Sequence, residues 1–253
     1  SPWSRGGWVN SQVFDHTSVI RFLEARFGVV EPNISAWRRA VAGDLTSAFD
    51  FAGDRTVRHA DSVRHACALP YALEAVGRMS ADGEHYRLTF RNPGSVGAVL
   101  HVYDRLALDR APRRYTIGAG ARLDDGWRLD GEGAYDLWLL GPDGFHRQFR
   151  GDRRDAGLLE TQLVPVSSGL RLRLINHGDA HLSVQIESRM GDGWRAMVHV
   201  QAGGALELKY AGCEDWYDLD ISAQDLPAFG RRLAGRIGAG KAGVPDPRLC
   251  QGA

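Results

Sequence analysis

The chain has 253 residues, 43 % hydrophobic and 25 % charged, with 31 basic residues balanced by 31 acidic ones. This composition is typical of a globular protein with a core, and the length suggests about one to two domains. The charge balance excludes a global attraction to nucleic acid or an anionic membrane, and no run of about 20 apolar residues predicts a membrane-spanning helix.

The first residues combine a turn, a polar cluster and a helix. Ser1-Pro2 before a Gly-Gly turn is typical of the exit from a strand, so we interpret the chain as the C-terminal part of a larger protein. Apolar residues at helical spacing from Val19 to Phe27 predict a helix with one apolar face, ending at Gly28.

Shorter elements are predicted after this helix. Residues 34–41 follow Pro32-Asn33 and have the length of a short helix, and residues 44–51 predict a capped turn with aromatic anchors. Residues 52–68 are polar and show no steady periodicity. We interpret them as a linker that crosses the surface.

The hydrophobic period changes to two after about Tyr71. Residues 85–91 alternate, with Tyr86, Leu88 and Phe90 on one face, which predicts a half-buried antiparallel strand. Further alternating segments, separated by turns rich in Gly, Pro and Asn, follow along the chain. This part therefore predicts an all-β structure.

The second half of the chain repeats the first. The repeat consists of three collinear matches: Asn92 with Asn176 at an offset of 84, Tyr135-Asp136-Leu137 with Tyr217-Asp218-Leu219 at 82, and Phe145, Arg147 and Gly151 with Phe229, Arg231 and Gly235 at 84. We therefore predict two tandem β-sandwich modules, residues 70–153 and 157–240, followed by a loose tail, residues 241–253.

One polar cluster could carry chemistry. Asp15-His16-Thr17-Ser18 lies at a turn-to-helix junction, where His16 could act as a metal ligand or acid/base that Asp15 orients. Alternatively, Asp15 and Thr17 cap the helix and His16 is a surface residue. No second His or carboxylate stands nearby at ligand spacing, so no metal site can be completed from this cluster.

The cysteines leave two interpretations open. Cys67, Cys213 and Cys250 follow no metal-binding spacing and are too few for a disulfide scaffold. Cys213 and Cys250 are either bridged or two unrelated thiols.

Several segments within the first 51 residues are distinctive: Ser1-Pro2-Trp3-Ser4-Arg5-Gly6-Gly7-Trp8-Val9, Phe14-Asp15-His16-Thr17-Ser18, Arg21-Phe22-Leu23-Glu24, and residues 37–41 and 43–51. In these segments the chain resembles the bacterial phosphocholine-preferring phospholipases C, members of the alkaline-phosphatase-like phosphoesterase superfamily. The tandem β-modules resemble the duplicated C-terminal domain of these enzymes.

The resemblance implies a mixed architecture. Residues 1–51 would be the C-terminal edge of an α/β alkaline-phosphatase-like catalytic domain, residues 52–69 a linker, and the all-β sandwich modules would dock on that domain. It also implies export, and therefore a secreted or periplasmic location.

The resemblance further implies hydrolysis of the phosphodiester of phosphatidylcholine or sphingomyelin at a membrane surface, releasing phosphocholine. A divalent metal ion of unknown identity and a Ser or Thr nucleophile would be supplied by residues upstream of Ser1. Asp15 and His16 carry over as the border of the active site, with Asp15 orienting His16, and Thr17 and Ser18 as a cap. We accordingly expect this chain alone to be inactive.

Two alternatives remain. The chain could be a non-catalytic β-sandwich module that binds lipid or a partner protein. The parent enzyme could also be an acid phosphomonoesterase of the same superfamily, although the resemblance links tandem β-modules to the phospholipases.

Overall fold

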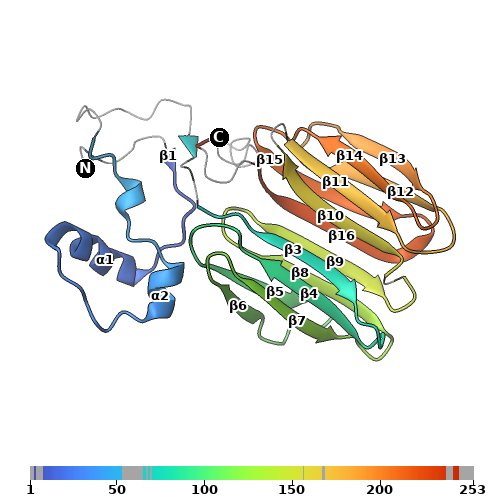
Figure 1. Ribbon diagram of the computed structural model, residues 1–253, viewed down its shortest axis with the longest axis horizontal. Helices are drawn as coiled ribbons and strands as arrows, with labels where there is room; N and C mark the ends of the chain where they lie inside the picture. The colour runs from blue at the N-terminus through green and yellow to red at the C-terminus, as the bar shows by residue number, and fades with distance from the viewer. Residues whose placement is uncertain are drawn as a thin grey trace.

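The computed structural model describes residues 3, 8–52, 65–66, 68, 70–155, 157–166, 169–237 and 242–244. A small helical N-terminal part leads into two β-sandwiches that lie side by side (Figure 1). Strands predominate, which agrees with the predicted β-modules. None of the helices in these ranges is long and apolar enough to cross a membrane.

The N-terminal part contains three helical elements and one small sheet. Its elements are β1 (Trp8–Val9), α1 (His16–Phe27), α2 (Ala36–Val41), the 3-10 helix η1 (Thr46–Ala48) and β2 (His65–Ala66). Helix α1 ends at Gly28, whose φ of 70° lies in the left-handed region that glycine adopts without strain. β2 lies in the predicted linker and pairs in parallel with β1.

The first sandwich has three strands in one layer and four in the other. The three-stranded sheet has the order β3-β4-β7, formed by β3 (Glu74–Met79), β4 (His85–Arg91) and β7 (Arg122–Arg128). The four-stranded layer has the order β6-β5-β8-β9, formed by β5 (Ala98–Asp104), β6 (Arg113–Ile117), β8 (Ala134–Leu140) and β9 (His146–Asp152).

The second sandwich repeats this arrangement. Its three-stranded sheet has the order β10-β11-β14, formed by β10 (Leu159–Val166), β11 (Gly169–Asn176) and β14 (Ala205–Tyr210). The four-stranded layer has the order β13-β12-β15-β16, formed by β12 (Leu182–Ser188), β13 (Arg195–Val200), β15 (Trp216–Ala223) and β16 (Leu226–Arg236). The sequence repeat is therefore a repeat of the strand order.

Each sandwich has its own hydrophobic core between its two layers. Tyr86, Leu88 and Phe90 all point inward and are buried, as their alternation predicts. The repeat-equivalent strand β11 buries three leucines between Leu170 and Leu174 in the same way. Burial of apolar side chains from both layers therefore stabilises each unit.

The two sandwiches share one sheet. β9 and β16 pair in antiparallel orientation, which joins the two four-stranded layers into one eight-stranded sheet, β13-β12-β15-β16-β9-β8-β5-β6. Gln148 lies opposite Arg232, its own repeat equivalent 84 residues later. The two units are therefore related by an approximate twofold axis through this residue pair.

A buried arginine from the first sandwich reaches across this axis. Arg147 of β9 donates from Nη1 to the carbonyl oxygens of His146 (2.8 Å) and Ala234 (2.6 Å). Its Nη2 donates to Tyr217 Oη at 2.8 Å. An arginine of one sandwich thus completes the hydrogen bonding of the other.

Arg231 of β16 makes the reciprocal contacts. Its Nη1 donates to the carbonyl oxygens of Gly230 (2.8 Å) and Arg150 (2.6 Å), and its Nη2 to Tyr135 Oη (3.1 Å). Its guanidinium carbon lies 4.3 Å from the centroid of the Phe229 ring. Like its counterpart, it is 5 % exposed, and no salt bridge to it occurs within the described ranges. Carbonyl dipoles and ring faces therefore stabilise both buried charges.

A polar network covers the outer face of the shared sheet. Arg232 donates to both carboxylate oxygens of Asp218 at 2.8 Å, and Gln148 Nε2 donates to Asp136 Oδ1 at 2.8 Å. His146 lies beside this network and is 7 % exposed, and its Nε2 has no hydrogen-bond partner among the described residues. Burial, and next the charge of Arg232, lower the pKa of His146 to about 4.

Because His146 is buried, we expect the stability of the fold to decrease in acid. The pKa of His146 is lower in the folded chain than its ordinary value, so below pH about 6.5 the unfolded chain binds the additional proton. We expect a loss of stability of about 3 kcal/mol as the pH falls from about 6.5 to about 4. Urea unfolding of the wild type and of His146→Asn across this range measures the effect. An equal pH dependence in both proteins would contradict it.

Candidate functional site

Asp15 begins helix α1 as its N-cap. Its Oδ1 accepts hydrogen bonds from the backbone N–H (2.8 Å) and the hydroxyl (2.5 Å) of Thr17. The Asp15 N–H in turn donates to Ser18 Oγ at 3.0 Å, which completes a capping box. Thr17 and Ser18 are buried beneath this turn. The first N–H groups of a helix have no acceptor within the helix, and the short side chain of Asp15 provides one.

The second carboxylate oxygen of Asp15 binds another element. Asp15 Oδ2 accepts from Arg38 Nη1 of helix α2 at 2.6 Å. The hydrogen bond from the Thr17 hydroxyl, and also the pairing with Arg38, lower the pKa of Asp15. Glu24 and Arg39 add a two-pronged ion pair at 2.7 and 2.8 Å. Helices α1 and α2 are therefore clamped together by charge-assisted hydrogen bonds.

His16 is the first residue of α1, and its side chain is exposed. No hydrogen bond joins it to Asp15 within the described ranges, where the carboxylate oxygens of Asp15 accept from Thr17 and Arg38. The structure thus places the two residues side by side without using Asp15 to orient the imidazole. Over the same ranges, no three His, Cys, Asp or Glu side chains form a group that could hold a metal ion.

The apolar face of α1 is uncovered. Val19, Ile20, Leu23 and Phe27 are exposed, with Phe27 at 66 %. The sequence predicts this stripe as a packing face, yet the described residues do not cover it. An exposed apolar stripe of this size is typical of a surface that contacts another protein element.

The helical part contacts the first sandwich at several points. The Val13 N–H donates to Tyr71 Oη at 3.3 Å, and Trp37 Nε1 donates to Thr116 Oγ1. A Cβ at Gly97 would lie 2.8 Å from the carbonyl oxygen of Ala40, so the close approach of α2 requires glycine there. The candidate residues on α1 are therefore held at one end of the β-sandwich pair.

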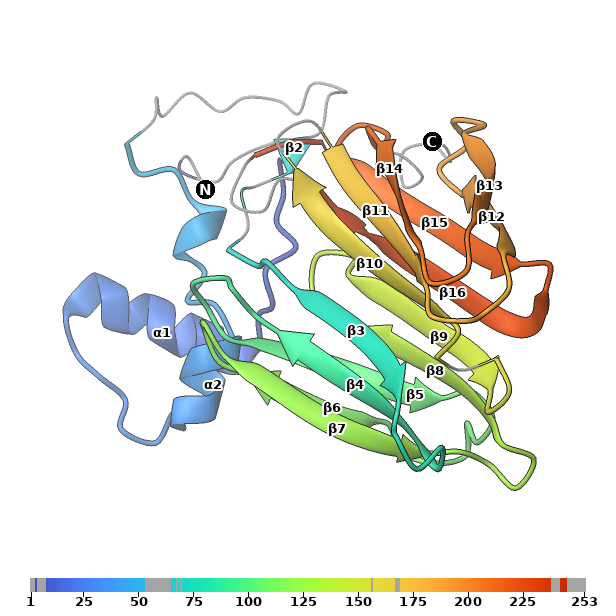
Figure 2. The same cartoon turned by 45° about the vertical axis from the view of Figure 1, so that its right-hand side comes forward.

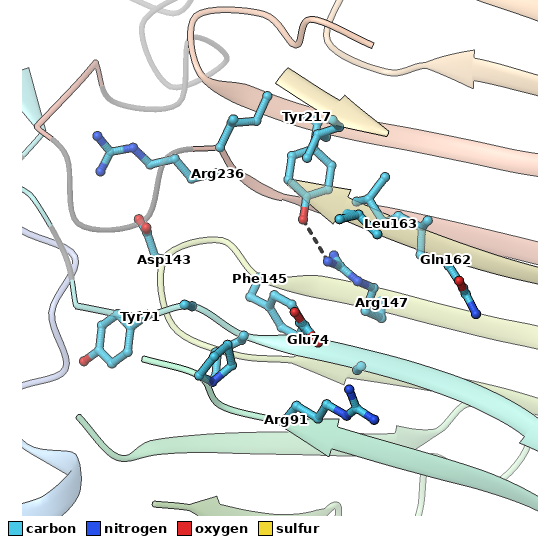
Figure 3. Close-up of a pocket in the computed structure, with 18 of the residues that line it drawn as sticks. Tyr71, Glu74, Arg91, Asp143, Phe145, Arg147, Gln162, Leu163, Tyr217 and Arg236 are labelled. Atoms are coloured by element: carbon cyan, nitrogen blue, oxygen red, sulfur yellow. Dashed lines mark hydrogen bonds between the residues drawn. The ribbon is translucent and has the colours of Figure 1, made fainter. Parts of the chain in front are cut away.

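A cavity of about 930 Å³ lies between the two sandwiches (Figure 3). Edge strands β3 and β10 form its walls, and Figure 2 shows these strands facing each other, one from each sandwich. Its floor includes Phe145, Arg147 and Tyr217, and Asp143 and Arg236 also line it. The repeat in the sequence predicts two modules, but the cavity follows only from how they pack.

Several predictions concern residues outside the described ranges. These residues include Cys67 and Cys250 of the disulfide alternatives, Ser1, Pro2 and residues 4–7 of the N-terminal motif, residues 53–64 of the predicted linker, and most of the predicted tail. Sequence reasoning missed Arg147 and Arg231, although both belong to a match that revealed the repeat.

The fold defines a class of protein: a tandem β-sandwich protein in which two repeated seven-stranded units share one sheet. The model of the family "Bacterial phospholipase C, C-terminal domain" matches residues 65–152 and again residues 159–236. The chain belongs to this family, which agrees with the resemblance of its tandem modules. The Phosphoesterase family model matches residues 1–30.

Individual relatives extend this assignment. The chain is 42 % identical to the non-hemolytic phospholipase C of Pseudomonas aeruginosa, over 98 % of this chain and 42 % of that protein. It is 34 % identical to the hemolytic phospholipase C of the same organism, over 98 % and 44 %. A segment covering 21 % of the chain is 58 % identical to phospholipase C A of Mycobacterium tuberculosis, over 10 % of that protein. The chain thus spans less than half of the two Pseudomonas relatives.

Proposed function

We propose that this chain is the C-terminal part of a secreted or periplasmic phospholipase C. The observation that carries the proposal is the match of residues 1–30 to the phosphoesterase family, on the N-terminal side of the doubled phospholipase C C-terminal domain at residues 65–152 and 159–236. Residues 1–51 would complete an α/β catalytic domain and residues 52–69 would link it to modules 70–153 and 157–240, with residues 241–253 as a tail. The exposed apolar face of α1 supports this proposal, because such a face packs well against further catalytic-domain residues.

The proposed reaction is hydrolysis of the phosphodiester of phosphatidylcholine or sphingomyelin, with release of phosphocholine. The nucleophile and the ligands of a divalent metal ion are assigned to residues outside this chain. The described residues do not fit a resident metal, since they hold no cluster of ligating side chains. We therefore derive no catalytic step from them.

We further propose that Asp15 and His16 border the active site. An exposed imidazole at a helix N-terminus is available to hydrogen-bond an anionic phosphodiester. Asp15 would position His16 through the helix cap and the Arg38 ion pair, which hold the first turn in place.

The role of His16 can be tested in the full-length enzyme. We expect His16→Ala to lower kcat by more than about tenfold, the usual size of a lost acid/base or charge-stabilising group. A chromogenic phosphocholine ester measures phosphodiesterase turnover, and the corresponding phosphomonoester tests the acid-phosphatase alternative. His181→Ala, a second exposed histidine far along the chain, is the matched control. An unchanged rate for His16→Ala would make His16 a surface residue.

The isolated chain tests whether the nucleophile lies outside these 253 residues. Because the nucleophile is assigned elsewhere, the 253-residue chain should not hydrolyse the phosphocholine ester above background. Turnover by this chain would contradict the proposal. Binding of lipid vesicles without turnover would favour the second candidate, a lipid-binding module, which the cavity between the sandwiches also favours.

A further inference from the structure

The approximate twofold axis places two related cavities between the sandwiches. One has a volume of about 930 Å³ and is lined by Arg147, and the other has about 240 Å³ and is lined by Arg231. Strands β3 and β10 line both, at opposite ends. The internal repeat therefore allows each residue of the large cavity to be compared with its equivalent in the small one.

An acidic side chain at the small cavity has three polar partners. Glu160 of β10 accepts from Arg78 Nη2 of β3 at 2.6 Å and from Gln162 Nε2 at 2.6 Å, and it contacts His177 Nε2 at 3.1 Å. The Arg78–Glu160 ion pair joins the two edge strands, which run in opposite sandwiches. A salt bridge therefore spans the two edge strands at this end of the groove.

The strand registers identify the equivalent acidic residue. Glu160 lies opposite Ile175, and Glu74 lies opposite Arg91. Ile175 and Arg91 are separated by the same 84 residues as the repeated asparagines, so they occupy the same place in the two units. Glu74 is therefore the counterpart of Glu160, and it lines the large cavity.

The partners of Glu160 are absent around Glu74. By the same registers, Val76 replaces Gln162 and Val164 replaces Arg78, and Pro93 stands 84 residues before His177. All three replacements are apolar and line the large cavity. No hydrogen bond or ion pair to the Glu74 side chain occurs within the part of the chain that the structure describes. The salt bridge of the small cavity thus has no equivalent beside Glu74 among the described residues.

Among the described residues, the other charged side chains of the cavity do not form an ion pair with Glu74 that would replace the missing salt bridge. Arg147 already donates to two carbonyl oxygens and to Tyr217, and the field of Arg236 acts on Asp143. Arg91 lies opposite Glu74 in the strand pair, but no ion pair between them is found among the described residues. Figure 3 shows Glu74 together with Phe145 and Arg147 among the residues that line the cavity.

We propose that this cavity binds an organic cation that carries an apolar portion. The positive charge pairs with Glu74, as the guanidinium of Arg78 pairs with Glu160 in the other half. The apolar portion lies between Leu163 and the aromatic floor formed by Phe145 and Tyr217. A carboxylate beside apolar and aromatic walls is a suitable site for such a ligand.

Calorimetric titration of the full 253-residue chain with octyltrimethylammonium tests the proposal, with octyl sulfate and octyl glucoside as anionic and neutral probes below their micelle concentrations. We expect one saturable site for the cation and at least about tenfold weaker binding of the other two. Equal binding of octyl sulfate, or no binding of the cation, would overturn the proposal.

Two variants test whether the ligand binds beside Glu74. Glu74→Gln should lower the affinity for octyltrimethylammonium about tenfold or more, whereas Glu132→Gln, an exposed glutamate in the turn before β8, should leave it unchanged. Val164 is 45 % exposed, so Val164→Arg is tolerated and should lower the affinity by placing a guanidinium in the cavity, while Val164→Leu should not. Wild-type binding by Glu74→Gln or Val164→Arg would overturn the assignment, provided that thermal midpoints match.

Discussion

Replacing Arg231 with alanine is expected to lower the free energy of unfolding by about 4 kcal/mol. The change leaves the carbonyl oxygens of Arg150 and Gly230 and the hydroxyl of Tyr135 without their donor, and it opens a cavity against Phe229. Urea unfolding followed by tryptophan fluorescence measures the loss, and the thermal midpoint should fall by about 10 °C.

The control for this prediction is another arginine-to-alanine change on the surface. Arg154 is 88 % exposed, and Arg154→Ala should change the stability by no more than about 0.5 kcal/mol. Arg147→Ala should behave like Arg231→Ala, because the two residues make reciprocal contacts. A loss below about 1 kcal/mol in both variants would show that the crossed contacts contribute little.

Asn176→Asp is expected to cost about 4 kcal/mol, because it buries a carboxylate against carbonyl oxygens. Asn176 is 1 % exposed, and its Nδ2 donates to the carbonyl oxygens of Ala180 (2.7 Å) and Val200 (3.0 Å). Its Oδ1 accepts from the Gly178 N–H at 2.9 Å. The substitution removes both side-chain N–H donors and adds a negative charge among acceptors. Urea unfolding at pH 7 measures the loss.

Two comparisons make this result specific. Burial raises the pKa of the introduced carboxyl group, so its penalty should shrink as the pH falls and the group becomes neutral. Gln201→Glu makes the same amide-to-carboxylate change at an exposed turn and should alter the stability by no more than about 0.5 kcal/mol. A penalty for Asn176→Asp that does not depend on pH would contradict the electrostatic explanation.

The same variant tests how the sandwiches unfold. Because β9 and β16 join them into one sheet and Arg147 and Arg231 cross between them, we expect a single cooperative transition. Asn176→Asp lies in the second sandwich and should shift the unfolding of Trp127 in the first by the same amount. Separate transitions would mean that each sandwich is an independent unit.

Local patterns in the sequence predicted the elements well. Alternation identified the inward face of β4, and Gly28 placed the end of α1. These features depend on neighbours along the chain, which is why spacing is informative. The apolar stripe of α1 was equally clear, but its exposure depends on what packs beside it, and no local pattern reports that.

The candidate site also combines features that local sequence predicts with features that depend on packing. The sequence brings Asp15 and His16 together, but it contains no indication that Arg38, 23 residues away, takes the second oxygen of Asp15. For Glu74 the missing information was the strand register, because the comparison with Glu160 requires knowing which residues lie opposite each other. A shift of one residue would have moved Glu74 to the other face of its strand.

By itself the sequence determined that this protein carries two copies of one β-rich unit after a helical segment that resembles the end of a phosphoesterase domain. Hydrophobic period and repeated turns encode these features locally. Only the tertiary structure decided that the copies share a sheet, that Arg147 and Arg231 cross between them, and that the salt bridge at one end of the groove has no equivalent beside Glu74 among the described residues. These outcomes depend on contacts between residues about 70 to 96 positions apart, and such contacts form only when the strands pack.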